Sequence, residues 1–349
     1  MPAFQRLVPS GQKLTLEEFT LTDRIVSEIA KTGVLNIYIR RVGGLGDVLM
    51  VALIAHALKQ KLFSHTYKVH LVTSPHFQDL IKKLKLVNSV LTDDDVSGSF
   101  IVNLQDKVDF LPVCTTGHRL DLMADSVGLH IKDVQTDFKI KMNPQWHAWG
   151  RRHLKRFSSK KKIAFSPWAT AKIRSWPEWS EFMSLLLQSG NYVVVLLHDK
   201  PMRVLGHPNL INLTGETNTV QLCSVLSECD AAVAVDSGVL HTCGFLDIPF
   251  VGLFGPINPE FRVKYYEKKE IIFLPDSCPK CPCWDWQTGA CSETDYFMNC
   301  MWSITPAMVF KSLEKLLETY TGVHEVKPES RLPWGGRNKK PHQIFEVGA

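Results

Sequence analysis

The 349-residue sequence has no apolar run of membrane-spanning length, and its N-terminus has no continuous apolar region behind a charged one, as a secretion signal would. Charge of one sign is not in large excess either, because the formal net charge is +5. These absences argue against a membrane-spanning or secreted protein and against a strongly basic nucleic-acid binder. They predict a cytoplasmic protein without a transmembrane segment, either free or peripheral at the inner face of a membrane.

Composition and patterning predict an α/β protein of two domains. Hydrophobic residues make up 45% and charged residues 21%, an ordinary globular balance in a chain longer than one average domain. Short apolar strands alternate with helical segments on both sides of the basic stretch RRHLKRFSSKKK, which indicates two Rossmann-like, doubly wound units facing a cleft. The predicted organisation is an N-terminal extension over residues 1–34, a first domain over 35–158, a second domain over 159–322 and a polar tail over 323–349.

A glycine turn follows the first predicted strand, in the segment RRVGGLGDVLM. Gly43, Gly44 and Gly46 permit a close backbone approach at the carboxyl end of the strand, where open α/β sheets bind ligands. The pattern is not G-x-G-x-x-G, and Asp47 would repel a neighbouring phosphate, so a dinucleotide site is disfavoured. An acid at this place can take a proton from an acceptor hydroxyl, and the alternative is that Asp47 only caps the helix.

The second half carries a longer pattern, VAVDSGVLHTCGFLDIPFVGLFGPINPE. A buried strand ends at Asp236, and Ser237 and Gly238 open a helix whose backbone N–H groups are suited to a diphosphate. His241 lies one helical turn further on, on the same side. The next strand ends in Gly255 and Pro256 at the same edge of the sheet. The alternative for this segment is a capped helix with a core histidine.

A third segment, SPWATAKIRSWPEW, follows the first strand of the second half and lies on a loop at the same edge. Arg174 or Lys172 can offset the charge that develops on a leaving diphosphate. Ser166 and Thr170 supply hydroxyl groups beside them. The alternative is that these basic residues only solvate the surface.

Together these segments resemble glycosyltransferase family nine, the lipopolysaccharide heptosyltransferase type with the two-domain GT-B fold. The resemblance spans about residues 35 to 320 and is most specific in GGLGDVLM, RSWPEWSEF, LTGETNTVQL and DSGVLHTCGFLDIPFVGLFGPINP. It implies an enzyme that moves a sugar, with inversion, from a nucleotide-sugar donor in the second domain to an acceptor hydroxyl in the first. No cofactor is required for such a transfer.

The resemblance also implies roles for single residues. Asp47 matches the position of the catalytic base, and Arg174 matches a basic residue that contacts the donor phosphate. The donor-binding motif corresponds to Asp236, Ser237, Gly238 and His241. Ile257 departs from the family pattern, because it replaces a residue with a hydroxyl group. The segment HDKP over 198–201 lies where the nucleoside is read and differs from the adenosine-binding pattern, so the base and the sugar stay open.

Five of the nine cysteines crowd into residues 278–300. Four thiolates of this crowd, those of Cys281, Cys283, Cys291 and Cys300, are a candidate structural zinc site. The spacing is not that of two C-x-x-C pairs, so a disulfide pair or unmodified thiols are the alternatives.

The acceptor is the least determined part of the prediction. The first hypothesis is a glycan or glycolipid of a bacterial surface, such as the lipopolysaccharide core. The second is modified DNA of a virus acting in its host's cytoplasm, which the basic stretch over 151–162 and the tail RNKKP keep open. The third is a binding module without catalysis, against which the intact Asp47 and donor motif argue. Nothing in the sequence predicts an oligomeric state.

Overall fold

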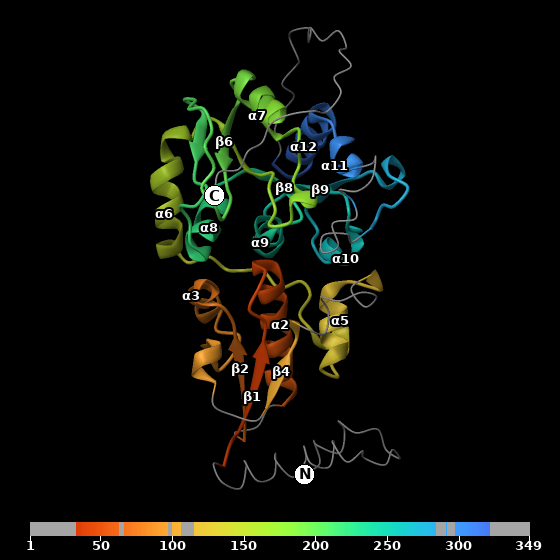
Figure 1. Ribbon diagram of the computed structural model, residues 1–349. Coiled ribbons are helices and arrows are strands. Elements are labelled where there is room, and N and C mark those ends of the chain that lie inside the picture. The colour runs from red at the N-terminus through yellow and green to blue at the C-terminus, as the bar shows by residue number, and fades with distance from the viewer. Residues whose placement is uncertain are drawn as a thin grey trace.

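The computed structural model describes residues 33–62, 66–96, 100–105, 115–283, 291 and 297–321. Two parallel sheets, each accompanied by helices, stand one above the other in Figure 1, which confirms the predicted fold class. The predicted polar tail and nearly all of the predicted N-terminal extension lie outside the described residues. None of the described helices combines the length and the apolar character needed to cross a membrane.

The first sheet has four strands in the order β3-β2-β1-β4. Its central strand β1 pairs in parallel with β2 from Leu35↔Tyr67 to Arg40↔Val72. Buried Ile37 and Ile39 anchor β1 in the core, and the short β3 and β4 complete the edges. The strands span Leu35–Arg40 (β1), Tyr67–Val72 (β2), Ser89–Leu91 (β3) and Ile101–Asn103 (β4), and the helices beside them span Leu45–Lys61 (α2), Pro75–Leu84 (α3) and Arg119–Ser126 (α5).

The second sheet has six strands in the order β10-β9-β8-β5-β6-β7, all parallel. Its centre is fully buried, as expected of a parallel sheet covered on both faces. The strands span Lys161–Ser166 (β5), Tyr192–Leu196 (β6), Leu210–Asn212 (β7), Ala231–Val235 (β8), Phe250–Phe254 (β9) and Lys269–Phe273 (β10). The helices span Pro144–Leu154 (α6), Trp179–Gln188 (α7), Thr219–Leu226 (α8), Gly238–Leu246 (α9), Glu260–Val263 (α10), Asn299–Trp302 (α11) and Pro306–Thr321 (α12).

Two central helices, α2 and α9, begin at the edges of the sheets that face each other (Figure 1). Twelve of the seventeen residues of α2 are buried, from Leu45 to Leu58, so this helix is apolar nearly all round. Seven of the nine residues of α9 are buried as well. Helices of this kind are fixed by packing on several sides, and their N-termini are therefore rigid platforms for a site.

Helix α6 packs on α8, although it precedes the domain boundary predicted at residue 158. The Gly150 N–H donates to Ser224 Oγ at 2.8 Å, and a Cβ atom at Gly150 would lie 2.3 Å from the Ser224 carbonyl oxygen. The His147 ring contacts Glu228 at 2.9 Å at the same interface. The chain thus joins the second sheet's helical layer before β5 begins.

We expect Gly150→Ala to destabilise the protein by about 1–3 kcal/mol, because the added methyl group has to push the α6 and α8 backbones apart. Gly117→Ala is the matched control, since a Cβ atom there would meet its nearest neighbour, Leu122 Cδ2, at 3.9 Å. Thermal unfolding of both variants measures the effect. Equal midpoints for the two variants would contradict the close packing of α6 on α8.

Candidate active site

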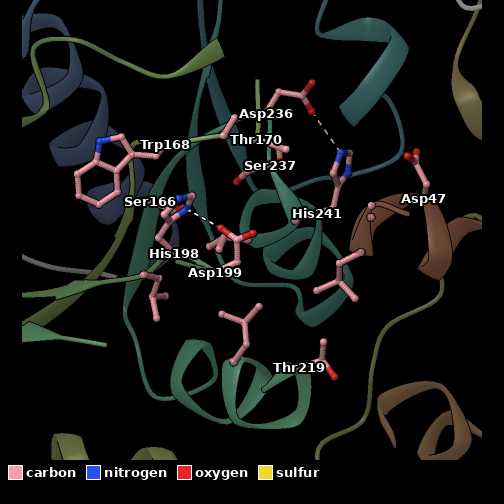
Figure 2. A pocket seen from close by; sticks show the side chains of 18 of the residues that line it. Asp47, Ser166, Trp168, Thr170, His198, Asp199, Thr219, Asp236, Ser237 and His241 are labelled. Carbon is pink, nitrogen blue, oxygen red and sulfur yellow. Dashed lines mark ion pairs between the residues drawn. The ribbon is translucent and has the colours of Figure 1, made fainter. Parts of the chain in front are cut away.

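A cavity of about 630 Å³ lies between the facing edges of the two sheets. Ten of the residues predicted from the sequence line it, and several of them are labelled in Figure 2. These ten are Gly44, Gly46, Asp47, Ser166, Thr170, Arg174, Asp236, Ser237, Gly238 and His241. The cavity is therefore built from the turn after β1, the loop after β5 and the turn after β8.

Asp47, in the first turn of α2, is held by two arginines from the first domain. Its Oδ2 atom accepts from Arg41 Nη2 at 2.6 Å and from Arg119 Nη1 at 2.7 Å. Burial by itself would raise the pKa of this carboxyl group, but the charges of Arg119 and then Arg41 outweigh it and hold the pKa well below its usual range. The N-cap residue of α2 is Gly44 and not Asp47. The side chain of Asp47 is part of the cavity wall.

Asp236, at the end of β8, is the centre of a second cluster, which belongs to the second domain. Arg174 Nη1 donates to its Oδ2 and to its carbonyl oxygen, both at 3.1 Å. His241 Nε2 lies 3.4 Å from Oδ1 and Arg262 Nε lies 3.5 Å from Oδ2. Burial favours the neutral acid, but the hydrogen bond from His241 and the charges of Arg262 and Arg174 hold the pKa of Asp236 well below its usual range.

Two residues of the cavity wall, Ser237 at the N-terminus of α9 and Arg174 on the loop after β5, each have a buried polar atom without a hydrogen-bond partner in the described chain. Ser237 has an extended backbone and is the N-cap residue, yet its Oγ atom is buried and makes no hydrogen bond within the described chain. The Nε atom of Arg174 is also buried and makes no hydrogen bond within the described chain. An unpaired buried donor is costly, so both groups and the free N–H groups of the helix are suited to an anionic ligand.

Arg174 lies on the short 3-10 turn Lys172–Arg174, and Trp176, two residues further along the chain, holds this turn in place. The Trp176 side chain is fully buried, and its indole N–H donates to the Ile304 carbonyl oxygen at 2.8 Å. The loop after β5 is thereby attached to the segment before α12. This attachment places the guanidinium group of Arg174 at the cavity.

Four predicted residues do not belong to the cavity wall. Lys172 precedes Arg174 on the same turn but does not line the cavity, and Gly43, Gly255 and Pro256 do not line it either. A Cβ atom at Gly255 would lie 2.8 Å from the Cys300 Sγ atom, so this glycine serves packing against the cysteine-rich segment. Their assignment to acceptor or donor binding stays a prediction.

Arg41, Arg119 and Arg262 were missed from the sequence, although they are the partners of the two carboxylates. Each is at most 6% exposed, and the pKa of Arg262 is lowered to about 10, chiefly by burial. Buried arginines are rare outside paired sites. For two of them position is a signal, since Arg41 lies two residues before Gly43 of the glycine turn and Arg262 follows GPINPEF.

The four cysteines of the predicted zinc site do not form a metal-binding group. Within the described residues no three His, Cys, Asp or Glu side chains gather in such an arrangement, and the eight described cysteines form no disulfide with one another. The Cys281 thiol contacts that of Cys300, and other groups of the chain also contact the thiols. Cys281 Sγ donates to the Gly255 carbonyl oxygen at 2.9 Å, and Cys291 Sγ accepts from the Met298 N–H at 3.4 Å.

Much of the basic stretch that kept a DNA acceptor open is paired within the protein. Lys161 and Lys162 both contact Asp230, at 3.3 and 3.4 Å, and Lys160 donates to Asn209. Arg151 contacts Glu228 at 3.2 Å. Pairing with nearby carboxylates reduces the positive potential that phosphate binding requires, so the structure gives the DNA hypothesis no support here.

The fold and the cavity define a two-domain protein of the GT-B architecture. Solved structures that share it include a glycosyltransferase family 9 protein from Veillonella parvula (TM-score 0.61, 14% identity, 81% of this chain and 97% of that one) and E. coli ADP-heptose LPS heptosyltransferase II (TM-score 0.59, 17% identity, 82% and 99%). The family model for glycosyltransferase family 9 (heptosyltransferase) matches residues 111–287, just over half of the chain.

The chain therefore belongs to glycosyltransferase family 9, which confirms the resemblance seen in the sequence. Lipopolysaccharide heptosyltransferase 2 of Salmonella typhimurium is 30% identical over 174 residues, which are 46% of this chain and 48% of that relative. The alignment thus spans about half the length of the curated relative.

Proposed function

We propose that the protein transfers a sugar from a nucleotide-sugar donor to a hydroxyl group of a lipopolysaccharide-type glycan, with inversion at the anomeric carbon. The observation that carries this proposal is the pair of carboxylate–arginine clusters that line one cavity, around Asp47 from the first domain and around Asp236 from the second (both carboxylates are labelled in Figure 2). Inverting transfer needs an acceptor-side base and donor-side positive charge, and each cluster offers one of these.

The donor diphosphate is proposed to lie at the N-terminus of α9. Ser237 Oγ, the Arg174 guanidinium and the N–H groups that follow Ser237 supply donors to its oxygens, and the buried Arg262 adds charge. As the bond between the anomeric carbon and the diphosphate oxygen breaks, the electron pair stays on that oxygen. Fixed positive groups stabilise the charge that develops there.

The nucleoside is proposed to lie at the end of the cavity lined by Trp168, His198 and Asp199 (Figure 2). The Trp168 ring packs against Trp179 at a centroid distance of 4.9 Å, which holds it in place as a surface for a base. The name of the E. coli neighbour supports an ADP-heptose-type donor.

The acceptor hydroxyl is proposed to donate to Asp47. Because the two arginines keep this carboxylate ionised, it accepts the hydrogen bond at any physiological pH and orients the oxygen toward the anomeric carbon. A carboxylate of such low pKa is a weak base for a resting alcohol. The attacking oxygen becomes strongly acidic as its bond to carbon forms, so the proton passes to Asp47 late in the reaction.

One transfer assay tests the whole proposal. A panel of nucleotide sugars is screened by thermal shift, and the donor that stabilises the protein most is incubated with a truncated lipopolysaccharide acceptor. The expected product carries one added sugar of inverted anomeric configuration by NMR. No stabilisation by any nucleotide sugar contradicts the function, and binding without transfer favours the catalytically silent module instead.

Arg174→Gln is expected to weaken the binding of ADP about 10- to 100-fold, because a charge-assisted contact to the diphosphate is lost. Lys172→Gln is the matched control, since this residue lies on the same 3-10 turn but not on the cavity wall. Calorimetry with ADP alone compares the two variants. If both variants bind ADP as the wild type does, the donor side of the cavity has been misassigned.

A further inference from the structure

Tyr266 lies behind the cavity wall, between α10 and β10, and its hydroxyl group reaches His241. The side chain is buried, and its ring lies on Gly244 of α9, where a Cβ atom would be 2.4 Å from Tyr266 Cγ. The rings of Phe245 and Phe250 pack around it at centroid distances of 5.7 and 6.1 Å. The packing leaves the phenol ring one position, with its oxygen 3.0 Å from His241 Nδ1.

The direction of this hydrogen bond follows from the chemistry of a buried phenol. Burial, and then the charges of Asp47 and Asp236, raise the pKa of Tyr266 well above its usual value, so the hydroxyl group keeps its proton. Within the described chain, His241 Nδ1 is the hydrogen-bond partner of that hydroxyl group. With the phenol as donor, Nδ1 accepts, and the ring proton of a neutral imidazole is on Nε2.

The Nε2 atom of His241 faces Asp236 Oδ1 at 3.4 Å (Figure 2), and the same carboxylate holds Arg174 through Oδ2. The contacts therefore form one row from Tyr266 through His241 and Asp236 to Arg174. His241 itself lines the cavity, whereas Tyr266 does not.

We propose that Tyr266 is a positioning residue of the donor site, which fixes His241 as the Nε2–H tautomer and so orients Asp236 and Arg174 toward the donor diphosphate. This inference rests on the proposed function for the identity of the ligand. The part that concerns Tyr266 and His241 rests on the geometry alone, and the two parts are tested separately.

The first test reads the imidazole directly and needs no ligand. Long-range ¹⁵N–¹H correlation spectra at about pH 8.5, above the ordinary titration range of histidine, distinguish the two tautomers, and the signal missing from His241→Ala identifies this residue. We expect a pure Nε2–H pattern in the wild type and a mixed pattern in Tyr266→Phe. Tyr265→Phe is the control, because the neighbouring hydroxyl contacts Asp121 instead. An Nδ1–H or mixed pattern in the wild type overturns the proposal.

The second test is a double-mutant cycle measured by calorimetry with ADP. Tyr266→Phe removes one hydrogen bond of an isosteric ring, and we expect it to weaken ADP binding about three- to tenfold. In the His241→Ala background the same change is expected to have less than about a twofold effect, because the residue through which it acts is gone. Additive effects, or wild-type affinity in Tyr266→Phe, overturn the proposal.

The two tests separate the inference from the function on which it rests. If ADP and other nucleoside diphosphates bind to none of these proteins, the proposed function fails and the donor part of the inference fails with it. The imidazole spectra still decide whether Tyr266 sets the tautomer of His241.

Discussion

We expect Asp47→Asn to lower turnover by a factor on the order of 100 or more, because the neutral amide can neither orient the acceptor hydroxyl as strongly nor take its proton. ADP affinity is expected to stay within about twofold, since the direct ion pairs of Arg174 and Arg262 are with Asp236. Steady-state kinetics and calorimetry with ADP measure the two effects. Near-normal turnover would leave Asp47 a purely structural residue.

From the structure we also expect Asp47→Asn to lower the stability of the protein, an effect that would be absent if Asp47 only capped the helix. Arg41 and Arg119 lose the charge of their shared partner, and we expect a loss of about 1–3 kcal/mol in the free energy of unfolding. Asp79→Asn is the control, since that side chain is 63% exposed and pairs with Lys83 one turn away. A loss of turnover without any change in stability would mean that the arginines are held by other groups.

The pH dependence of this stability difference has a definite sign. Folding depresses the pKa of Asp47, so its contribution is fully present above the unfolded value of 3.8 and is lost as the pH falls toward the folded value. The difference in unfolding midpoint between wild type and Asp47→Asn should therefore be constant from about pH 7 to about pH 5 and shrink below about pH 4. A difference that grows toward low pH would contradict the ion pairs.

Gly46→Ala is expected to reduce kcat/KM by a factor on the order of 100 or more, because it separates the two walls of the cavity. A Cβ atom at Gly46 would lie 2.4 Å from His241 Cδ2 and 2.8 Å from His241 Cβ, because α2 and α9 of the two domains are in direct contact here. His241 cannot move aside, since Tyr266 and Asp236 hold its two ring nitrogens. The space beside Gly46 is thus occupied by His241 rather than open to a ligand.

Gly43→Ala is the matched control, because no atom lies within 4 Å of a Cβ built at Gly43. Alanine is also a better helix former than glycine, so Gly46→Ala should not weaken α2 itself. Kinetics and the radius of gyration from solution scattering compare the two variants, and only Gly46→Ala should be expanded and slow. Full activity in Gly46→Ala would show that the reaction does not need this contact between the domains.

The fold followed from the sequence because its signals are local. The apolar strand VLNIYIRR and the buried run DAAVAV became β1 and β8, and Asn218 caps α8 by accepting from the Gln221 N–H. The short edge strands β3, β7 and β10 were missed. Three to five residues give too few alternations to stand out from a loop, and pairing with a longer neighbour stabilises such strands.

The site was only half predictable for a similar reason. Asp236 follows the end of β8, Arg174 lies in the loop after β5, and Asp47 lies in the first turn of the helix after β1. These places adjoin the carboxyl ends of parallel strands, where the topology of an open α/β sheet predicts a ligand. Arg119 starts α5, far along the chain from Asp47, and meets it only because α5 packs beside α2. Tyr266 carries no sequence pattern at all, since its role depends on a glycine in α9 that leaves room for its ring.

The attachment of the interdomain segment to α9 determines where the chain can bend. The Ile140 N–H donates to the Phe245 carbonyl oxygen at 2.7 Å, and Lys139 contacts Asp247 at 3.4 Å, so from there onward, through α6, the segment moves with the second sheet. A hinge between the sheets must then lie upstream of Lys139, after the 3-10 turn Ile131–Asp133. Rotation about this hinge would part the Lys264–Asp121 pair and the Thr219 hydrogen bond to the His76 carbonyl oxygen, on two flanks of the cavity at once.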